Sequence, residues 1–338
     1  MKSTRFPSIT LHNVEETASA DWDADGRRLY RVPKSIRSEL NDGARERMGH
    51  PTGCEVRFCP KRQDSEVEIT LSAAEPTQIR VFWGSFQPTK PITINSTPTT
   101  LTLRVPERLQ ELSEGVETGR FDQNVCRILF ERIVPVALHD VIGDCRPPQP
   151  EELPDSRYLA YGTSITEGAK ASSPHLSYVS QLARRRGYDA LNLGTSGSAY
   201  LDAALAEYIA DRDDWDIATL GLSVNMTTGE FSTQEFHQRA EYFVNTIADA
   251  HPHKQIVCVT LFPYYADITE TGDTDLASAF REALRTVVSE SPQNNLSLVE
   301  GTNLLTGSGL TWDLLHPSDA GMDSIGNGLA SHFATILD

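Results

Sequence analysis

Ser164 stands in a stretch of residues that suits nucleophilic chemistry. The segment Tyr158–Gly168 reads YLAYGTSITEG, in which an apolar run of strand length stops at Gly162 and small and capping residues follow. Such a strand-to-helix turn places a serine at the C-terminal edge of a sheet, where an open α/β sheet binds its ligand. A serine hydroxyl is a weak nucleophile without a neighbouring base, so this chemistry requires a histidine from elsewhere in the chain.

His316 is the histidine whose neighbours fit that requirement. It lies in the segment TWDLLHPSDAGM, three residues after Asp313 and directly before Pro317, which suits the first turn of a helix. At this spacing on one short loop, the carboxylate can accept a hydrogen bond from one ring nitrogen and leave the other for Ser164. The sequence therefore predicts Ser164 as nucleophile, His316 as base and Asp313 as the group that orients the base.

Two further strand ends carry groups that stabilise an oxyanion. Asn192–Gly197 (NLGTSG) and Gly221–Asn225 (GLSVN) follow the next two expected strands. In a doubly wound sheet of strand order 2-1-3-4-5, these two strands flank the strand before Ser164, so the three loops meet. An oxyanion hole needs donors that are already in place. The sequence predicts three: the backbone N–H groups of Ser164 and Gly197 and the side-chain amide of Asn225.

The residues from 155 onwards alternate between strand and helix patterns. Strands are expected at 158–161, 189–193, 215–221, 255–261 and 296–299. Helices are expected around 176–186, 199–210, 236–247, 276–288 and 322–336. This alternation predicts an α/β fold, a flavodoxin-like parallel sheet with helices on both faces.

The N-terminal part of the chain has a β pattern instead. Segments 66–72, 79–83 and 100–105 are β-favouring or alternate polar and apolar residues, with prolines and glycines between them. This pattern predicts an all-β sandwich or jelly roll. The proline-rich, acidic segment 146–155 interrupts it, so two domains are expected, at 1–150 and 155–338. The aromatic residues Phe82, Trp83 and Phe86 are interpreted as sandwich core rather than as a carbohydrate platform.

Composition excludes several classes of partner. The 338 residues carry a net charge of −17, which argues against nucleic acid and anionic membranes because phosphate contacts need clustered Lys and Arg. No segment has the length of a membrane span or the core of a signal peptide, so a cytoplasmic location is expected. The five scattered cysteines favour free thiols. Cys54 and Cys59 have no second ligand pair, so no metal is expected, and the chemistry requires no cofactor.

The second part of the chain resembles the SGNH, or GDSL-like, family of esterases and acyltransferases. The likeness spans Tyr158–Asp338 and rests on four blocks in order: GTSIT, NLGTSG, the asparagine at 225, and DLLHP. It implies the same triad, and it implies Gly197 as the oxyanion glycine, with Gly194 as the alternative register. Thr163 and Met226 depart from the acidic residues common at those positions. These departures concern residues that position the site, not the nucleophile.

The N-terminal part, with RVPKSIRSEL and the strands after it, resembles the β-sandwich of one branch of that family. The branch includes carbohydrate deacetylases and acyltransferases. The resemblance thus implies a serine esterase acting on a small-molecule or carbohydrate acyl ester, and leaves transfer to an acceptor hydroxyl open. A catalytically silent carbohydrate-binding or partner-binding protein is the alternative from another class. Oligomeric state stays undetermined.

Several residues have simpler interpretations. A glycine–serine turn alone forms for backbone reasons, and a phosphate loop is disfavoured because the glycine spacing is one residue too long and Lys170 does not follow Gly168 directly. Asn225 and Asp313 could serve only as caps. The remaining candidate histidines are interpreted as rim or surface residues: His175, His237, His251 and His253. Four residues could line a pocket or pack in the core: Met226, Phe262, Tyr264 and Tyr265.

Overall fold

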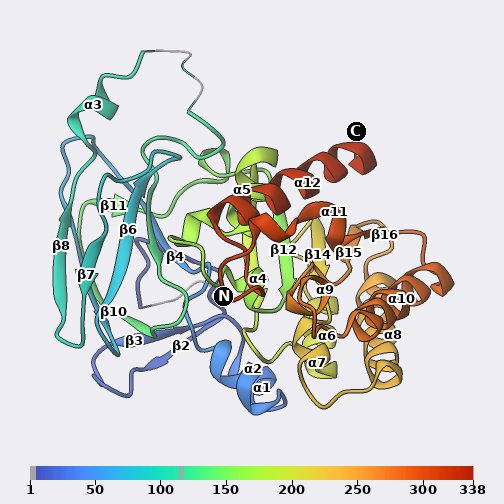
Figure 1. The fold of residues 1–338 in the computed structure, drawn as a ribbon. Helices are drawn as coiled ribbons and strands as arrows, with labels where there is room; N and C mark the ends of the chain where they lie inside the picture. The colour runs from blue at the N-terminus through green and yellow to red at the C-terminus, as the bar shows by residue number, and fades with distance from the viewer. Residues whose placement is uncertain (1–4, 114–115, 117, 338) are drawn as a thin grey trace. The chain divides into compact units, whose positions relative to one another are not determined.

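The computed structural model of the chain describes residues 5–113, 116 and 118–337 (Figure 1). The chain divides into two compact units. The first comprises residues 1–34 and 48–155, and the second comprises residues 35–47 and 156–338. Residues 35–47 therefore group with the second unit, although they lie within the range 1–150 predicted for the β-rich domain.

Two antiparallel sheets make up the first unit. One has the order β1-β4-β9-β6-β7 with β11 beside β4, and the other has the order β2-β3-β10-β5-β8. The first sheet contains β1 (Thr10–His12), β4 (Glu55–Pro60), β6 (Thr77–Trp83), β7 (Ile92–Ile94), β9 (Cys126–Phe130) and β11 (Cys145–Arg146). The second contains β2 (Glu16–Ser19), β3 (Arg27–Tyr30), β5 (Val67–Ala73), β8 (Thr99–Leu103) and β10 (Val136–Gly143). A short helix, α3 (Glu107–Gln110), follows β8.

The core of the first unit draws side chains from both sheets. In β5, Val67, Ile69 and Leu71 are fully buried while Glu68 is exposed, as the alternation of the sequence predicts. These side chains share one apolar cluster with residues of the other sheet, such as Phe58. The predicted all-β sandwich is confirmed. Phe82 and Trp83 are buried as well, which agrees with their interpretation as core, whereas Phe86 is half-buried.

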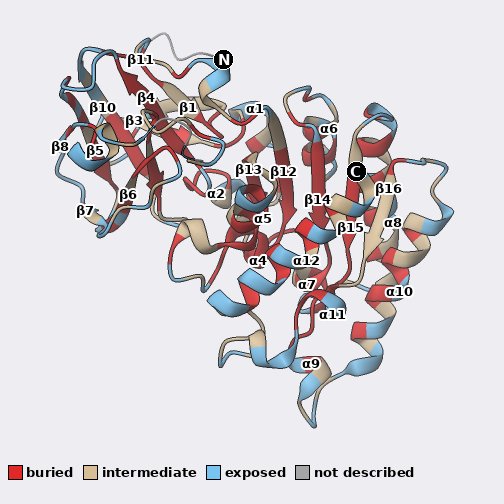
Figure 2. Ribbon diagram, turned by 90° about the horizontal axis from the view of Figure 1, so that it is seen from above, coloured by how far each residue is buried: buried red, intermediate tan, exposed pale blue. Residues whose placement is uncertain are grey.

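A five-stranded parallel sheet organises the second unit. Its order is β13-β12-β14-β15-β16, which is the predicted 2-1-3-4-5 order when the strands are numbered along the chain. The strands are β12 (Ser156–Gly162), β13 (Tyr188–Gly194), β14 (Ile217–Gly221), β15 (Gln255–Val259) and β16 (Leu296–Val299). Figure 2 shows the inner strands as buried. Gly162 pairs in register with Gly194 on one side and Gly221 on the other, so the three strands end at one level.

Long helices cover both faces of this sheet. They are α5 (Tyr178–Arg186), α6 (Ala203–Ala210), α8 (Thr233–Ala250), α10 (Thr274–Glu290) and α12 (Asp319–Leu337). Tyr158 of β12 packs edge-on against Phe333 of α12, with 5.7 Å between ring centroids. Tyr161, on the opposite face of the strand, stacks on Phe243 of α8 at 4.6 Å. The flavodoxin-like α/β fold expected for this part of the chain is confirmed.

Short helices follow the strand ends and hold the loops. They are α4 (Ser164–Glu167), α7 (Val224–Thr227), α9 (Tyr265–Ile268) and α11 (Gly301–Leu304), and the segment 35–47 contributes α2 (Asp42–Arg47) after α1 (Lys34–Arg37). Helix α6 begins at Ala203, later than the expected start near residue 199. The residues between β13 and α6 therefore form a loop at the carboxyl edge of the sheet.

Across the described part of the chain, no helix combines the length and the apolar character needed to cross a membrane. All five cysteines are free and buried. Burial raises the pKa of the Cys54 and Cys258 thiols to about 12, so these thiols stay protonated at neutral pH.

Candidate active site

Ser164 is the first residue of α4, directly beyond the end of β12. The Thr163 hydroxyl caps the helix by accepting a hydrogen bond from the Ile165 N–H, and Gly168 ends it in the left-handed conformation. A Cβ at Gly162 would lie 2.3 Å from the Thr166 Oγ1, so only glycine allows this tight connection. The turn thus holds the Ser164 side chain in one place at the edge of the sheet.

A hydrogen-bonded series joins Ser164 to the loop before α12. The Ser164 hydroxyl lies 2.9 Å from His316 Nε2, across 152 residues of sequence. The other ring nitrogen, Nδ1, lies 2.9 Å from Asp313 Oδ2. Because an ionised carboxylate only accepts hydrogen bonds, Nδ1 is the protonated nitrogen of the neutral ring and Nε2 accepts from the serine. The structure brings together the three residues predicted as the triad.

The carboxylate of Asp313 accepts several hydrogen bonds from the loop that carries it. Its Oδ1 accepts hydrogen bonds from the N–H groups of Leu315 at 3.0 Å and His316 at 2.9 Å, and from the Thr311 hydroxyl at 2.8 Å. Leu314 has φ of 54°, the left-handed turn that brings this carboxylate back to the ring. Partial burial raises the pKa of Asp313, but the hydrogen bonds from His316, Leu315 and Thr311 outweigh it, so the pKa lies well below its usual value.

Gly197 lies in the loop after β13, at φ of 69°. A Cβ built on it would meet no atom within 4 Å, so the space beside it is open. Among the described residues, no acceptor takes a hydrogen bond from its N–H. Gly194, the alternative oxyanion glycine, donates its N–H to Asn192 Oδ1 at 2.9 Å and packs against the backbone of Glu167. The contacts of Gly194 are therefore those of a structural residue in the turn.

Asn225 lies on α7, beyond the end of β14. Its Oδ1 accepts a hydrogen bond from the Ala199 N–H at 3.2 Å, which turns its amide nitrogen away from that contact. Ser223, two residues earlier, has φ of 102°, a conformation that strains a non-glycine residue. A further bond, from the Thr195 N–H to the Gly162 carbonyl at 2.8 Å, ties the loop after β13 to the end of β12. The loops with Ser164, Gly197 and Asn225 are thus joined to one another.

The other histidines lie outside this hydrogen-bonded series. His175 is half-buried and bonds to the Ser173 hydroxyl at 2.7 Å, and His253 is exposed, as expected. The interpretation of His251 as a surface residue is wrong: it is 7% exposed and packs against the Trp215 ring. His251 lies beside a proline in a predicted loop, which indicates a surface position. The contact with Trp215 could not be predicted from these neighbours, because Trp215 lies 36 positions earlier in the chain.

The apolar residues considered for a substrate pocket divide into two groups. Met226, Phe262 and Tyr264 are buried and belong to the core, while Tyr265 is 39% exposed. Trp312, next to Asp313, is 96% exposed and was not singled out from the sequence. A large aromatic residue in a loop that carries a predicted catalytic carboxylate is the signal that would have indicated it.

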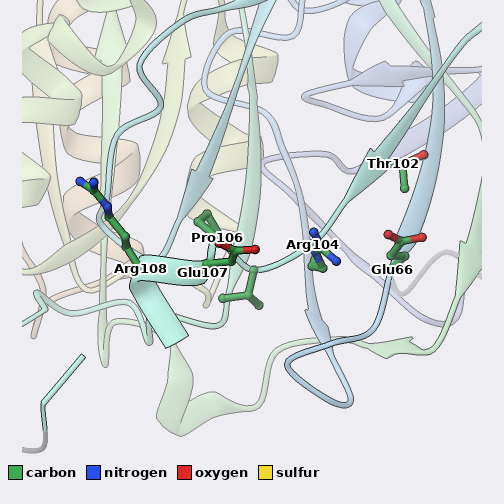
Figure 3. Close-up of a pocket in the computed structure, with 7 residues that line it drawn as sticks. Glu66, Thr102, Arg104, Pro106, Glu107 and Arg108 are labelled. Carbon is green, nitrogen blue, oxygen red and sulfur yellow. The ribbon is translucent and has the colours of Figure 1, made fainter. Parts of the chain in front are cut away.

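No group of three or more His, Cys, Asp or Glu side chains that could hold a metal ion occurs within the described residues. Figure 3 shows a pocket of the first unit. Its wall is formed by charged residues of both signs, with apolar neighbours, and includes none of the predicted site residues: Glu66, Thr102, Arg104, Val105, Pro106, Glu107 and Arg108.

The geometry around Ser164 agrees with a comparison against known protein families. Residues 156–332, more than half of the chain, match the family described as GDSL-like lipase/acylhydrolase. The chain belongs to this family. The resemblance inferred from the four sequence blocks is therefore confirmed, and so is the expected enzyme class, a carboxylic ester hydrolase or related acyltransferase. A search of the curated proteins finds no match to the sequence.

Several solved structures share the fold over nearly the whole chain. The salicylyl-acyltransferase SsfX3 from a tetracycline biosynthetic pathway has a TM-score of 0.80 at 15% identity, covering 100% of this chain and 97% of its own. A family two carbohydrate esterase from Cellvibrio japonicus has a TM-score of 0.65 at 14% identity, covering 98% and 96%. A GDSL-like lipase from Bacteroides ovatus has 0.65 at 19% identity, covering 97% and 98%. The likeness thus includes the β-rich unit.

Proposed function

We propose that this protein is a serine esterase that hydrolyses an O-acyl ester through an acyl-enzyme intermediate. The observation that carries the proposal is the hydrogen-bonded series from Ser164 Oγ through His316 to Asp313, with 2.9 Å at each step. An activated hydroxyl, a base of fixed tautomer and a carboxylate that orients the base are the parts that acyl transfer by serine requires.

Acylation begins when Ser164 Oγ attacks the ester carbonyl carbon and its proton passes to His316 Nε2. The carbonyl π electrons move to oxygen, which gives a tetrahedral oxyanion. When this intermediate collapses, the bond to the alcohol oxygen breaks, and the alcohol leaves with the proton from Nε2. Asp313, held ionised by its hydrogen bonds, stabilises the imidazolium that forms during the step.

Deacylation repeats these steps with water in place of the serine. His316 Nε2 removes a proton from water as its oxygen attacks the acyl carbon, and Ser164 Oγ leaves with that proton. The products are a carboxylic acid and the regenerated hydroxyl. In both halves of the reaction, the N–H groups of Ser164 and Gly197 and the Asn225 amide donate to the oxyanion. Two observations support these roles: the Gly197 N–H has no acceptor among the residues that the structure describes, and the Asn225 oxygen is taken by the Ala199 N–H, which leaves the amide nitrogen to donate.

Acyl transfer to an acceptor hydroxyl is the second candidate reaction. It is supported by the similarity to a salicylyl-acyltransferase over the whole chain. The chemistry differs only in the nucleophile that attacks the acyl-enzyme, since an alcohol replaces water. The family two carbohydrate esterases among the similar structures support acylated carbohydrates or other small acyl esters as substrates.

A fluorophosphonate probe and p-nitrophenyl acetate test the proposal together. We expect the probe to label Ser164 covalently and to abolish release of p-nitrophenol in proportion to labelling. A folded protein that stays unlabelled at Ser164 would instead be a catalytically silent binding protein. Product analysis with and without an added alcohol separates the two reactions: free acetate in both samples indicates an esterase, whereas a new ester formed at the expense of acetate indicates a transferase.

A further inference from the structure

The helical segment of residues 35–47 approaches the loop that carries Gly197. Although it precedes that loop by about 150 positions in the chain, both belong to the second unit. A Cβ at Gly43 would lie 2.7 Å from the Ser198 Cβ, so the helix α2 and the loop are in close contact. Residues 35–47 carry no chemistry-bearing motif of their own.

Two side chains of this segment donate to backbone carbonyls on either side of Gly197. Arg47 Nε donates to the Ser196 carbonyl at 3.2 Å. Asn41 Nδ2 donates to the Ser198 carbonyl at 3.1 Å. The Ser196 carbonyl belongs to the same peptide unit as the Gly197 N–H, and the Ser198 carbonyl belongs to the peptide unit that joins Ser198 to Ala199. Side chains from outside the loop therefore hold both of these units, while Gly197 itself is at φ of 69° with open space beside it.

Asn41 is in turn held in one orientation. Its Nδ2 also donates to Asp202 Oδ2 at 2.7 Å, and its Oδ1 accepts from the Ala44 N–H at 3.0 Å. The side-chain oxygen thus caps α2 while the nitrogen reaches the loop. Because the amide uses its oxygen and its nitrogen in different contacts, it cannot turn over without losing three hydrogen bonds.

Further bonds fix the remainder of the loop. The Tyr200 carbonyl accepts from Arg239 at 3.1 Å, the Tyr200 hydroxyl donates to the Gly197 carbonyl at 3.1 Å, and the Ala199 N–H donates to Asn225. A donor for an oxyanion must be in place before charge develops, and a flexible glycine cannot hold its own N–H in place. The contacts around Gly197 provide this rigidity.

We propose that Asn41 and Arg47 are positioning residues for the oxyanion hole, which aim the Gly197 N–H by holding the carbonyls of Ser196 and Ser198. Their role is to hold the loop through these two hydrogen bonds rather than to take part in the reaction. The inference rests on the proposed function, because it assigns a role to a hole that only an acyl-transfer reaction uses. It extends that function by making a segment from the N-terminal part of the chain a structural component of the site.

The test compares Asn41→Ala and Arg47→Ala with the wild type, using p-nitrophenyl acetate as substrate and phenylboronic acid as a tetrahedral, anionic analogue of the intermediate. Misplacement of one donor by about 1 Å costs up to about a hundredfold in rate. We expect kcat to fall ten- to a hundredfold with little change in KM. The inhibition constant for the boronic acid should rise by the same factor as kcat/KM falls, because both depend on the hole.

End-point titration with the fluorophosphonate supplies the readout that a structural role alone would not reproduce. If the variants merely unfold in part, the titratable fraction of Ser164 falls while the boronic acid binds the remaining sites with its wild-type constant. If the proposal holds, the titratable fraction stays near one while the constant rises. Arg45→Ala is the matched control, because the contacts of Arg45 with the described residues stay within the segment. Its guanidinium donates to the carbonyls of Arg37, Ser38 and Leu40 and pairs with Asp42.

The double variant Asn41→Asp with Asp202→Asn tests the hydrogen bond to the Ser198 carbonyl separately from the stability of α2. It keeps an oxygen at position 41 to cap α2 and restores an amide–carboxylate pair between the two positions, but it leaves the Ser198 carbonyl without its donor. We expect the melting temperature to recover relative to Asn41→Asp alone while kcat stays low. Recovery of kcat together with stability would overturn the role of the Ser198 contact.

The outcomes separate the inference from the function on which it rests. A wild-type protein that is neither labelled at Ser164 nor active overturns both. A labelled, active wild type whose Asn41→Ala and Arg47→Ala variants keep wild-type kcat and boronic acid affinity overturns the inference alone. Equal losses in Arg45→Ala and Asn41→Ala would also overturn it, since the segment would then act only through its own stability.

Discussion

The side-chain oxygen of Asn225 accepts a hydrogen bond from the Ala199 N–H at 3.2 Å. This contact joins the loops that follow β13 and β14, on the two sides of the strand that leads to Ser164. Because the contact uses the side-chain oxygen, the NH₂ group of Asn225 points away from Ala199 and is left to act as a donor. The pair thus gives the sequence prediction for Asn225 a specific geometry that mutation can test.

Asn225→Ala should lower kcat by about 10² to 10³, as removal of a single oxyanion donor does in serine hydrolases. Asn225→Asp is the matched variant, because a carboxylate keeps the acceptor for Ala199 but cannot donate. We expect Asn225→Asp to lose as much activity as Asn225→Ala while retaining more stability. Steady-state kinetics with p-nitrophenyl acetate and thermal melting check this, and near-normal kcat in Asn225→Asp would exclude the amide as a donor.

Ser164→Ala should remove most of the rate of ester hydrolysis, and only the acceleration that comes from substrate binding and the oxyanion hole should remain. Loss of a triad member leaves a residual acceleration of about 10³ to 10⁴ over water. The hydroxyl is small, and within the described part of the chain its side-chain hydrogen bond is the one with His316, so the fold should be retained. Kinetics and circular dichroism measure the two effects. Unchanged turnover in a folded Ser164→Ala variant would contradict the mechanism.

Gly197→Ala should impair catalysis more than stability. The left-handed φ of 69° costs an alanine about 1 to 2 kcal/mol, and no atom blocks the new Cβ. Relief of that strain would move the N–H away from the oxyanion. Gly187→Ala is a matched control, because Gly187 has φ of 70° at the end of α5. We expect similar losses of unfolding free energy in urea for both variants, and a large fall in kcat only for Gly197→Ala.

Asp313 should make stability depend on pH on the acid side. Its pKa in the folded protein lies below the unfolded value of about 3.9. The stabilisation by its hydrogen bonds is therefore complete above pH of about 4 and is lost as the pH falls through the folded pKa. The difference in unfolding free energy between wild type and Asp313→Asn should shrink as the pH drops from 6 to 3. A constant difference over that range would contradict the assignment.

Asp313→Asn should also lower kcat by about 10³ to 10⁴ at neutral pH, because an amide can no longer hold the required tautomer of His316. The same variant thus separates the two roles of the carboxylate. At pH 7 we expect the variant to lose both kcat and free energy of unfolding. One pH series in which both quantities are measured follows the two effects separately. Equal kcat values for the variant and the wild type would place the orienting group elsewhere.

Local sequence determined the elements and the chemistry-bearing residues of this protein. Hydrophobic periodicity indicated the parallel sheet and its helices, because the period of burial is a property of each segment alone. Ser164, Asp313 and His316 could be named from residue type and spacing, since the carboxylate and the ring lie three residues apart on one loop. The strand order followed from the general behaviour of doubly wound sheets.

The tertiary structure alone decided the contacts between distant segments. Nothing in the sequence around Asn41 or Arg47 indicates that they reach the carbonyls beside Gly197, because that approach depends on how residues 35–47 pack on the second unit. His251 was misplaced for the same reason, since its burial comes from Trp215 and not from its own neighbours. The proposal of Gly197 rather than Gly194 as the oxyanion glycine likewise rests on which N–H already has an acceptor, and this is a tertiary contact. The sequence predicts the candidate catalytic groups, but their relative positions depend on long-range hydrogen bonds that no local pattern encodes.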